Sequence, residues 1–261
     1  MAHKARKRFG QNFLHDTFYQ HQIIDTLKVQ TDDHWVEIGP GQGALTDHLI
    51  GKSQTLDAVE LDRDLAQLLS ARYAHHDNVT IHSQDALKFD FTQLAKDHPI
   101  RLVGNLPYNI STPLIFRFLS QRACLQDAYF LLQKEVVDRL TATPGHTTYG
   151  KLSVMIQQMF QVTALFSIPP HAFQPQPKVQ STFIRLVPYS EPPIRVLQQE
   201  TFATVVKQAF MHKRKTLRNN LKSLIPDDAL VGLNIRPESR AETLTIEQFA
   251  QIANYLTVHS D

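Results

Sequence analysis

Residues 36–46 read Val-Glu-Ile-Gly-Pro-Gly-Gln-Gly-Ala-Leu-Thr, an apolar run that ends in three alternating glycines and then continues into a helix-like start. Glycine carries no Cβ, so the backbone can turn tightly here and come close to a ligand. The helix after such a turn points its free N–H groups toward whatever lies over the turn. The stretch therefore predicts a strand, a ligand-binding turn and a helix of an open α/β sheet.

The glycine spacing alone leaves three interpretations open, which are a nicotinamide enzyme, a methyl-donor enzyme and a purely structural turn. Gly39, Gly41 and Ala44 also fit the relaxed dinucleotide fingerprint, and Glu60 follows about twenty residues later, as that fingerprint expects. A choice between these interpretations needs the rest of the chain.

The composition is that of an ordinary globular protein, with 261 residues, 42% hydrophobic and 20% charged, and a net charge of +2. Length favours one large domain with a smaller partner, and affinity for nucleic acid would have to come from local patches. The single cysteine, Cys124, excludes an internal disulfide and indicates a reducing compartment, so we expect a cytoplasmic protein. We find no signal-peptide pattern, no membrane-spanning run and no metal-ligand spacing among the histidines, and we predict no metal.

Strand and helix patterns alternate through the first two thirds of the chain. Strands are expected at residues 35–38, 55–61, 79–81, 101–104 and 128–132, and helices at 44–50, 65–72 and 112–120. This alternation predicts a parallel, doubly wound sheet. Residues 163–168 and 181–186 read as two further strands, and their hairpin-like spacing allows one of them to be antiparallel.

A proline-rich break at residues 188–193 marks a boundary, after which only helical patterns remain, at 201–222 and 246–256. We therefore expect a sheet domain over residues 1–189 and a small helical domain over 190–261. The N-terminus carries four cations, Lys4, Arg6, Lys7 and Arg8, a pattern that on its own is typical of a solvated tail.

Several strands end on a polar residue at the same edge of the expected sheet. Glu60 is placed to accept both hydroxyls of a ribose, and Asp85 could accept from the exocyclic amine of an adenine. A single acid after a strand is usually a cap. Several that converge on a glycine turn indicate a cofactor that contains adenosine.

The fourth strand ends in Asn105-Leu106-Pro107-Tyr108, which matches the Asn/Asp/Ser-x-Pro-aromatic pattern of amino-methyltransferases. An adenine amine is a poor nucleophile because its lone pair is conjugated with the ring. The carbonyls of the Asn105 side chain and the Leu106 backbone can each accept one amine N–H, which aims the lone pair at a methyl group. Pro107 would fix the turn, and Tyr108 offers a ring on which the base can stack.

These motifs together resemble the ribosomal RNA adenine dimethyltransferases that use S-adenosylmethionine, and the resemblance covers nearly the whole chain. It rests on segments 11–14, 37–43, 60–62, 84–86, 105–111, 133–136, 149–153, 173–181 and 214–219. The pattern is most similar to the bacterial branch that dimethylates two adjacent adenines in the 3′-terminal hairpin of small-subunit (16S) rRNA. The resemblance implies a Rossmann-like methyltransferase sheet with a small C-terminal helical domain, acting on 16S rRNA in the small subunit or its precursor. Nothing in the sequence suggests more than a monomer.

The resemblance also implies the site residues. The expected cofactor contacts are Asn12, Leu14, Gly39, Gly41, Glu60, Leu61, Asp85, Ala86 and Asn105. The expected catalytic set is Asn105, Leu106, Pro107, Tyr108 and Phe173, with Phe173 on the face of the base opposite Tyr108.

Residues 201–222 contain no acid, and we expect five of their cations to lie on one side of a single helix, where they could contact RNA phosphates. These five are Lys207, Arg214, Lys215, Arg218 and Lys222. With the N-terminal cations they would form two basic patches that bind RNA. Two alternatives stay open, which are a large-subunit adenine methyltransferase of the macrolide-resistance type and a noncatalytic assembly factor on the same scaffold.

Overall fold

The computed structural model describes residues 11–96, 98–107 and 110–259. Its strands are β1 (Phe13–Leu14), β2 (His34–Ile38), β3 (Thr55–Glu60), β4 (Val79–Ser83), β5 (Ile100–Asn105), β6 (Leu125–Gln133), β7 (Phe160–Ile168), β8 (Phe173–Gln174) and β9 (Ser181–Pro188). Its helices are α1 (Thr17–Leu27), α2 (Thr46–Leu49), α3 (Arg63–Arg72), α4 (Ser111–Ser120), α5 (Lys134–Leu140), α6 (Lys151–Gln157), α7 (Gln199–Ala209), α8 (Leu217–Leu221), α9 (Asp227–Gly232) and α10 (Ile246–Val258).

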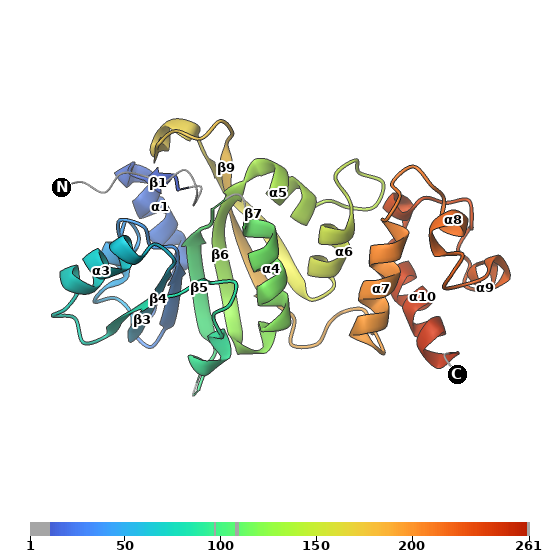
Figure 1. The fold of residues 1–261 in the computed structure, drawn as a ribbon, viewed down its shortest axis with the longest axis horizontal. Coiled ribbons are helices and arrows are strands. Elements are labelled where there is room, and N and C mark those ends of the chain that lie inside the picture. The colour runs from blue at the N-terminus through green and yellow to red at the C-terminus, as the bar shows by residue number, and fades with distance from the viewer. Residues whose placement is uncertain (1–10, 97, 108–109, 260–261) are drawn as a thin grey trace. The chain divides into compact units, whose positions relative to one another are not determined.

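Seven strands form one mixed sheet in the order β4-β3-β2-β5-β6-β9-β7 (Figure 1). The pairs from β4 to β6 are parallel, and β9 runs antiparallel to β6. The chain builds outward from β2 through β3 to β4 and then returns to the other side of β2 with β5. The predicted α/β sheet is thereby confirmed, including one antiparallel strand among the last two.

Side chains alternate between the two faces of the sheet, as the pleat requires. Tyr129 and Leu131 of β6 belong to a core cluster with Ile23 and Leu27 of α1. The intervening Phe130 stacks on Phe118 of α4, with ring centroids 5.0 Å apart. Helices α1 and α4 therefore cover opposite faces.

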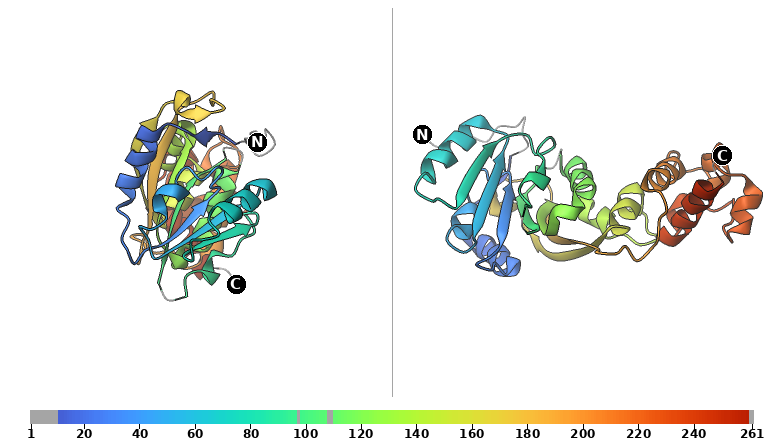
Figure 2. Two further views of the ribbon diagram at one scale, coloured as in Figure 1. Left: turned by 90° about the vertical axis from the view of Figure 1, so that its left-hand side faces the viewer. Right: turned by 90° about the horizontal axis from the view of Figure 1, so that it is seen from below.

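A second, two-stranded sheet joins the N-terminal segment to the loop before β9. Strand β1 pairs antiparallel with β8, so that Phe13 lies opposite Gln174 and Leu14 opposite Phe173. The backbone N–H of His15 continues this pairing by donating to the Ala172 carbonyl at 3.0 Å. Figures 1 and 2 show the two segments side by side at one end of the large sheet. Strands this short give no alternation to read, and the sequence did not predict them.

The chain divides into two compact units, one that runs up to Val137 and includes Gln161–Pro188, and one made of Asp138–Phe160 and the described residues from Tyr189 on. Residues 138–160, with α6, therefore group with the C-terminal helices, whereas the sequence placed a single division after residue 189. That the two parts are independent domains stays a prediction.

The prediction of one helix over residues 201–222 is wrong. The structure has two helices there, α7 and α8, with a turn between them. The buried Asn220 accounts for the break. Its side-chain amide donates to the Ala209 carbonyl at 2.7 Å and to the His212 carbonyl at 3.2 Å, and so holds the connecting turn out of the helix.

Candidate functional site

A cavity of about 1040 Å³ lies in the first unit, at the carboxyl ends of β2, β3 and β5. It sits where the strand order reverses on either side of β2, the position at which open α/β sheets bind ligands. Its lining includes all the expected cofactor contacts, namely Asn12, Leu14, Gly39, Gly41, Glu60, Leu61, Asp85, Ala86 and Asn105. The tertiary structure thus brings together residues from five separate segments of the chain.

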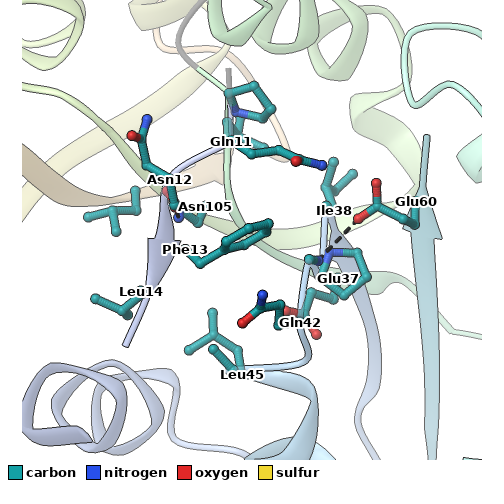
Figure 3. Close-up of a pocket in the computed structure, with 18 of the residues that line it drawn as sticks. Gln11, Asn12, Phe13, Leu14, Glu37, Ile38, Gln42, Leu45, Glu60 and Asn105 are labelled. Carbon is teal, nitrogen blue, oxygen red and sulfur yellow. Dashed lines mark hydrogen bonds between the residues drawn. The ribbon is translucent and has the colours of Figure 1, made fainter. Parts of the chain in front are cut away.

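The glycine turn forms the floor of this cavity. Gly39, Gly41 and Gly43 all have positive φ angles, of 66°, 59° and 87°. A Cβ on Gly41 would lie 2.9 Å from the ring of Phe13, so glycine is required for the N-terminal strand to close over the turn. Figure 3 shows Phe13 projecting into the cavity from the side opposite Glu60.

Glu60 connects the first and second strand ends. Its carboxylate accepts from the backbone N–H of Gly41 at 3.1 Å (Figure 3). It also accepts from the backbone N–H of Asp62 at 2.8 Å. Burial raises the pKa of Glu60, and the two N–H donors oppose that rise. A carboxylate fixed in this way at the cavity wall suits a pair of ligand hydroxyls.

Asn105 ends β5 with its amide group oriented. Its Nδ2 donates to the backbone carbonyl of Asn12 at 2.7 Å. Because a carbonyl oxygen can only accept, the amide end of Asn105 must face Asn12, and the side-chain carbonyl is the end that remains to accept from a ligand. Gly104 lets β5 approach β2 at this point, since a Cβ there would lie 2.6 Å from the Ile38 carbonyl.

Asp85 lines the cavity and also caps a local turn, because its Oδ1 accepts from the backbone N–H of Leu87 at 2.9 Å. The same side chain therefore has a structural role beside the proposed ligand contact. Leu106 is buried and Pro107 lines the cavity, whereas Tyr108 lies outside the described residues.

The structure corrects the predicted role of Phe173, which was expected to stack on the target base. Its ring is 1% exposed and belongs to the core cluster with Leu14, Ala172 and Phe183, so it is not presented for stacking on a base. The pairing of β8 with β1 explains this burial, because it places Phe173 opposite Leu14, and both side chains belong to the same core cluster. From the same loop, Gln174 and Pro175 line the cavity instead.

Glu37 also lines the cavity, although its place in the glycine motif did not predict a role in the site. It is 2% exposed and accepts from the Thr46 hydroxyl at 2.6 Å. Burial raises its pKa from 4.5 to about 7, and nearby Glu60 and Asp47 add to the rise. An acid inside an apolar strand, next to a glycine turn, was the signal that could have marked it.

We expect Glu37→Gln to stabilise the ligand-free protein at pH 8 by about 3 kcal/mol and to have little effect near pH 5. Between the two pKa values the folded state keeps a proton that the unfolded state has lost. The free energy of unfolding therefore falls as pH rises from 4.5 to about 7, and glutamine removes that dependence. Urea unfolding at both pH values measures it, with exposed Glu135→Gln as the control. Equal stabilities at pH 8 would contradict a carboxylate that titrates in the core.

The expected cationic face of the second unit is only partly present. Lys207, Arg214, Lys215 and Lys222 are exposed, but the break between α7 and α8 separates them from a common helix face. Arg218 forms ion pairs with Asp227 and with Glu238, the latter at 2.8 Å, so two acids from later in the chain already neutralise it. The N-terminal cations Lys4, Arg6, Lys7 and Arg8 lie outside the described residues.

In the described part of the chain, no group of three or more His, Cys, Asp or Glu side chains could hold a metal ion. Within those same residues, no helix is both long and apolar enough to cross a bilayer.

Comparisons with known proteins identify the family of this chain. The family model for ribosomal RNA adenine dimethylase matches residues 2–258. The chain is 52% identical to ribosomal RNA small subunit methyltransferase A of Hahella chejuensis, over 99% of this chain and 95% of that protein. It is 46% identical to the Pseudomonas aeruginosa protein of the same name, over 97% and 95%.

Two solved structures share the fold at 24% sequence identity. A dimethyladenosine transferase from Plasmodium falciparum matches with a TM-score of 0.82, over 94% of this chain and 98% of that one. The 23S rRNA methyltransferase ErmE matches with a TM-score of 0.73, over 94% and 100%. The Rossmann-like methyltransferase fold and the family resemblance are both confirmed, and the chain belongs to the ribosomal RNA adenine dimethylase family.

Proposed function

We propose that this protein transfers methyl groups from S-adenosylmethionine to N6 of two adjacent adenines in the 3′-terminal hairpin of 16S rRNA. The product is N6,N6-dimethyladenosine in the small ribosomal subunit or its precursor. The observation that carries the proposal is the oriented side-chain carbonyl of Asn105 at the edge of the cavity, whose volume of about 1040 Å³ leaves room for both a cofactor and a target base. The relatives at 46% and 52% identity, both named for the small subunit, support this choice of RNA. A ribosomal substrate also supports action in the cytoplasm, and we propose that the protein acts as a monomer.

The residues present fit S-adenosylmethionine. Glu60 offers a fixed carboxylate for the ribose, and Leu61 and Ala86 offer an apolar slot for the adenine, next to Asp85. When bound, the cofactor supplies a methyl group that is already activated on a sulfonium. The glycine turn brings backbone without side chains against the same ligand.

Asn105 and Leu106 direct the attack. The Asn105 side-chain carbonyl and the Leu106 backbone carbonyl accept the two N–H groups of the adenine amine, which localises the lone pair on nitrogen. No strong base is required, because a protonated product amine is acidic enough to lose its proton to water. Orientation and charge placement therefore supply most of the rate. The adenine must leave its stack to reach this point, as base-modifying enzymes generally require.

The deciding experiment is methyl transfer from labelled S-adenosylmethionine to small and large ribosomal subunits from a strain that lacks both the small-subunit and the large-subunit adenine methylation. The labelled RNA is then digested, and the modified nucleoside is identified by mass analysis. Dimethyladenosine in the 3′ hairpin of the small subunit is the expected result. Label in the large subunit would move the protein to the macrolide-resistance class. Absence of label in both, with the cofactor bound, would favour an assembly factor.

For RNA binding, we expect Arg214→Ala with Lys215→Ala to weaken binding and to reduce the slope of log K against log salt by about two. Both side chains are exposed and each can release a counterion from one phosphate. Arg218→Ala should change the slope less, because Asp227 and Glu238 already pair with that charge. Titrations at several salt concentrations measure both slopes. A larger slope change for Arg218→Ala than for the double variant would contradict this assignment.

A further inference from the structure

Beside the glycine turn, three side chains that are not among the expected cofactor or catalytic residues are joined by hydrogen bonds. We define Asp47, Arg72 and Tyr73 as the brace. We propose that the brace is a positioning device that holds the turn in its ligand-binding shape and so sets the affinity for the cofactor. This inference rests on the proposed function and adds to it residues that act through the turn.

The brace holds the turn by direct contacts. Arg72 donates through Nη1 to the backbone carbonyl of Gln42 at 3.1 Å and through Nη2 to the Asp47 carboxylate at 2.6 Å. Tyr73 donates its hydroxyl to the other oxygen of Asp47 at 2.7 Å. The backbone N–H of Asp47 in turn donates to the Gly43 carbonyl at 3.0 Å. The carbonyl oxygens of Gln42 and Gly43 are therefore both held, directly or through Asp47.

Tyr73 also touches the turn sterically. A Cβ on Gly43 would lie 2.4 Å from the Tyr73 hydroxyl oxygen, while the next atoms, from Leu69 and Arg72, would be 3.4 and 3.5 Å away. The hydroxyl thus occupies the space that any side chain at Gly43 would need. Gly43 has a φ of 87°, a backbone conformation that is strained for any residue with a side chain. Glycine is therefore required here both by this φ and by the contact with Tyr73.

The arrangement matters for binding because the turn is made of glycines. Three glycines in five residues have many accessible conformations, and a ligand that had to order them would lose affinity. Arg72 of α3 holds the Gln42 carbonyl, and the backbone N–H of Asp47 in α2 holds the Gly43 carbonyl, so part of this cost is already met before the ligand binds. Gln42 and Asp47 themselves line the cavity, so a change in the brace reaches the ligand directly.

The first test compares two tyrosine variants by calorimetric titration with S-adenosylmethionine. Tyr73→Phe removes the hydrogen bond to the Asp47 carboxylate, through which Tyr73 supports the turn, and should raise the Kd by about three- to tenfold. Tyr149→Phe is the matched control, because the buried Tyr149 hydroxyl has no hydrogen-bond partner among the described residues. We expect the control to bind as the wild type does. If the two variants bind S-adenosylmethionine with equal affinity, the proposed role of the brace is wrong.

A second test uses Arg72→Ala, with Arg63→Ala on the same helix as its control, because both side chains are exposed and the variants should fold. In steady-state kinetics, Arg72→Ala should raise the KM for the cofactor more than it lowers kcat, and should leave the KM for RNA unchanged. A variant that only destabilised the fold would lower the amount of active protein, and with it the apparent kcat, without raising the KM for the cofactor. A change confined to kcat or to the KM for RNA would overturn the proposal.

The steric contact predicts a rescue. Gly43→Ala alone should lose cofactor affinity strongly, and Gly43→Ala combined with Tyr73→Phe should recover part of the loss, because the atom at 2.4 Å is gone. If the loss of cofactor affinity in the double variant equals the product of the losses in the two single variants, contact between Tyr73 and the turn is contradicted. If wild-type protein fails to bind S-adenosylmethionine, the proposed function fails. If the wild type binds and the brace variants match it, only the brace fails.

Discussion

Asn105→Ala is expected to reduce methyl transfer by about 10²- to 10³-fold while the protein still folds and binds the cofactor. The substitution removes the side-chain carbonyl that accepts from the adenine amine, and with it the localisation of the lone pair. It also removes the hydrogen bond to the Asn12 carbonyl, which costs some rigidity at the N-terminal strand. Single-turnover transfer at saturating cofactor, beside calorimetric binding of S-adenosylmethionine, measures the two effects separately.

Asn105→Asp is the matched control for that experiment. Aspartate keeps an oxygen acceptor of the same size but cannot donate to the Asn12 carbonyl. We expect it to retain more activity than alanine and less than the wild type. If Asn105→Ala turns over at the wild-type rate, the amine-acceptor role is wrong. If cofactor binding is lost in step with activity, Asn105 acts mainly on the cofactor.

Phe173→Ala is expected to lower the free energy of unfolding by about 3 to 5 kcal/mol, the usual cost of removing a buried aromatic ring. The ring is 1% exposed and fills the core beneath the paired β1 and β8, next to Leu14 and Phe183. Below the melting transition, transfer per folded molecule should fall by less than it does for Asn105→Ala. Urea unfolding and single-turnover transfer on the same preparation distinguish the two effects.

Phe18→Ala provides a control at an exposed position, since Phe18 is 68% exposed on α1 and its loss should change stability little. An opposite pattern for Phe173→Ala, with unchanged stability and a large loss of transfer, would restore the stacking role that the sequence indicated. In that case Phe173 would have to leave the core when the target base enters.

The strands and helices of the sheet were predictable because their signals are local. The expected strands at residues 35–38, 79–81 and 101–104 lie inside β2, β4 and β5, and the expected strand at 55–61 extends one residue beyond β3. Apolar runs separated by helical patterns allow few arrangements other than a parallel sheet. The glycine turn and Glu60 could be assigned for the same reason, because parallel strands bring their carboxyl ends to one edge.

The predictions that were wrong depended on side-chain contacts that do not follow the helical repeat. The helix over 201–222 has the right periodicity, but the Asn220 side chain holds the turn between α7 and α8 by its carbonyls. Arg218 is part of a basic segment in the sequence, yet Asp227 and Glu238 pair with it in space. Side-chain hydrogen bonds of this kind leave no periodic pattern that the sequence alone could reveal.

The sequence by itself determined the fold class, the family and the set of strand-end residues, since each rests on local periodicity or on a motif. Only the tertiary structure decided which end of the Asn105 amide can accept, because that depends on the carbonyl of Asn12, 93 residues away. It also decided that Phe173 belongs to the core and that Arg72 and Tyr73 hold the glycine turn. These outcomes depend on which side chains meet after the strands have paired, and burial and hydrogen bonding then select among them.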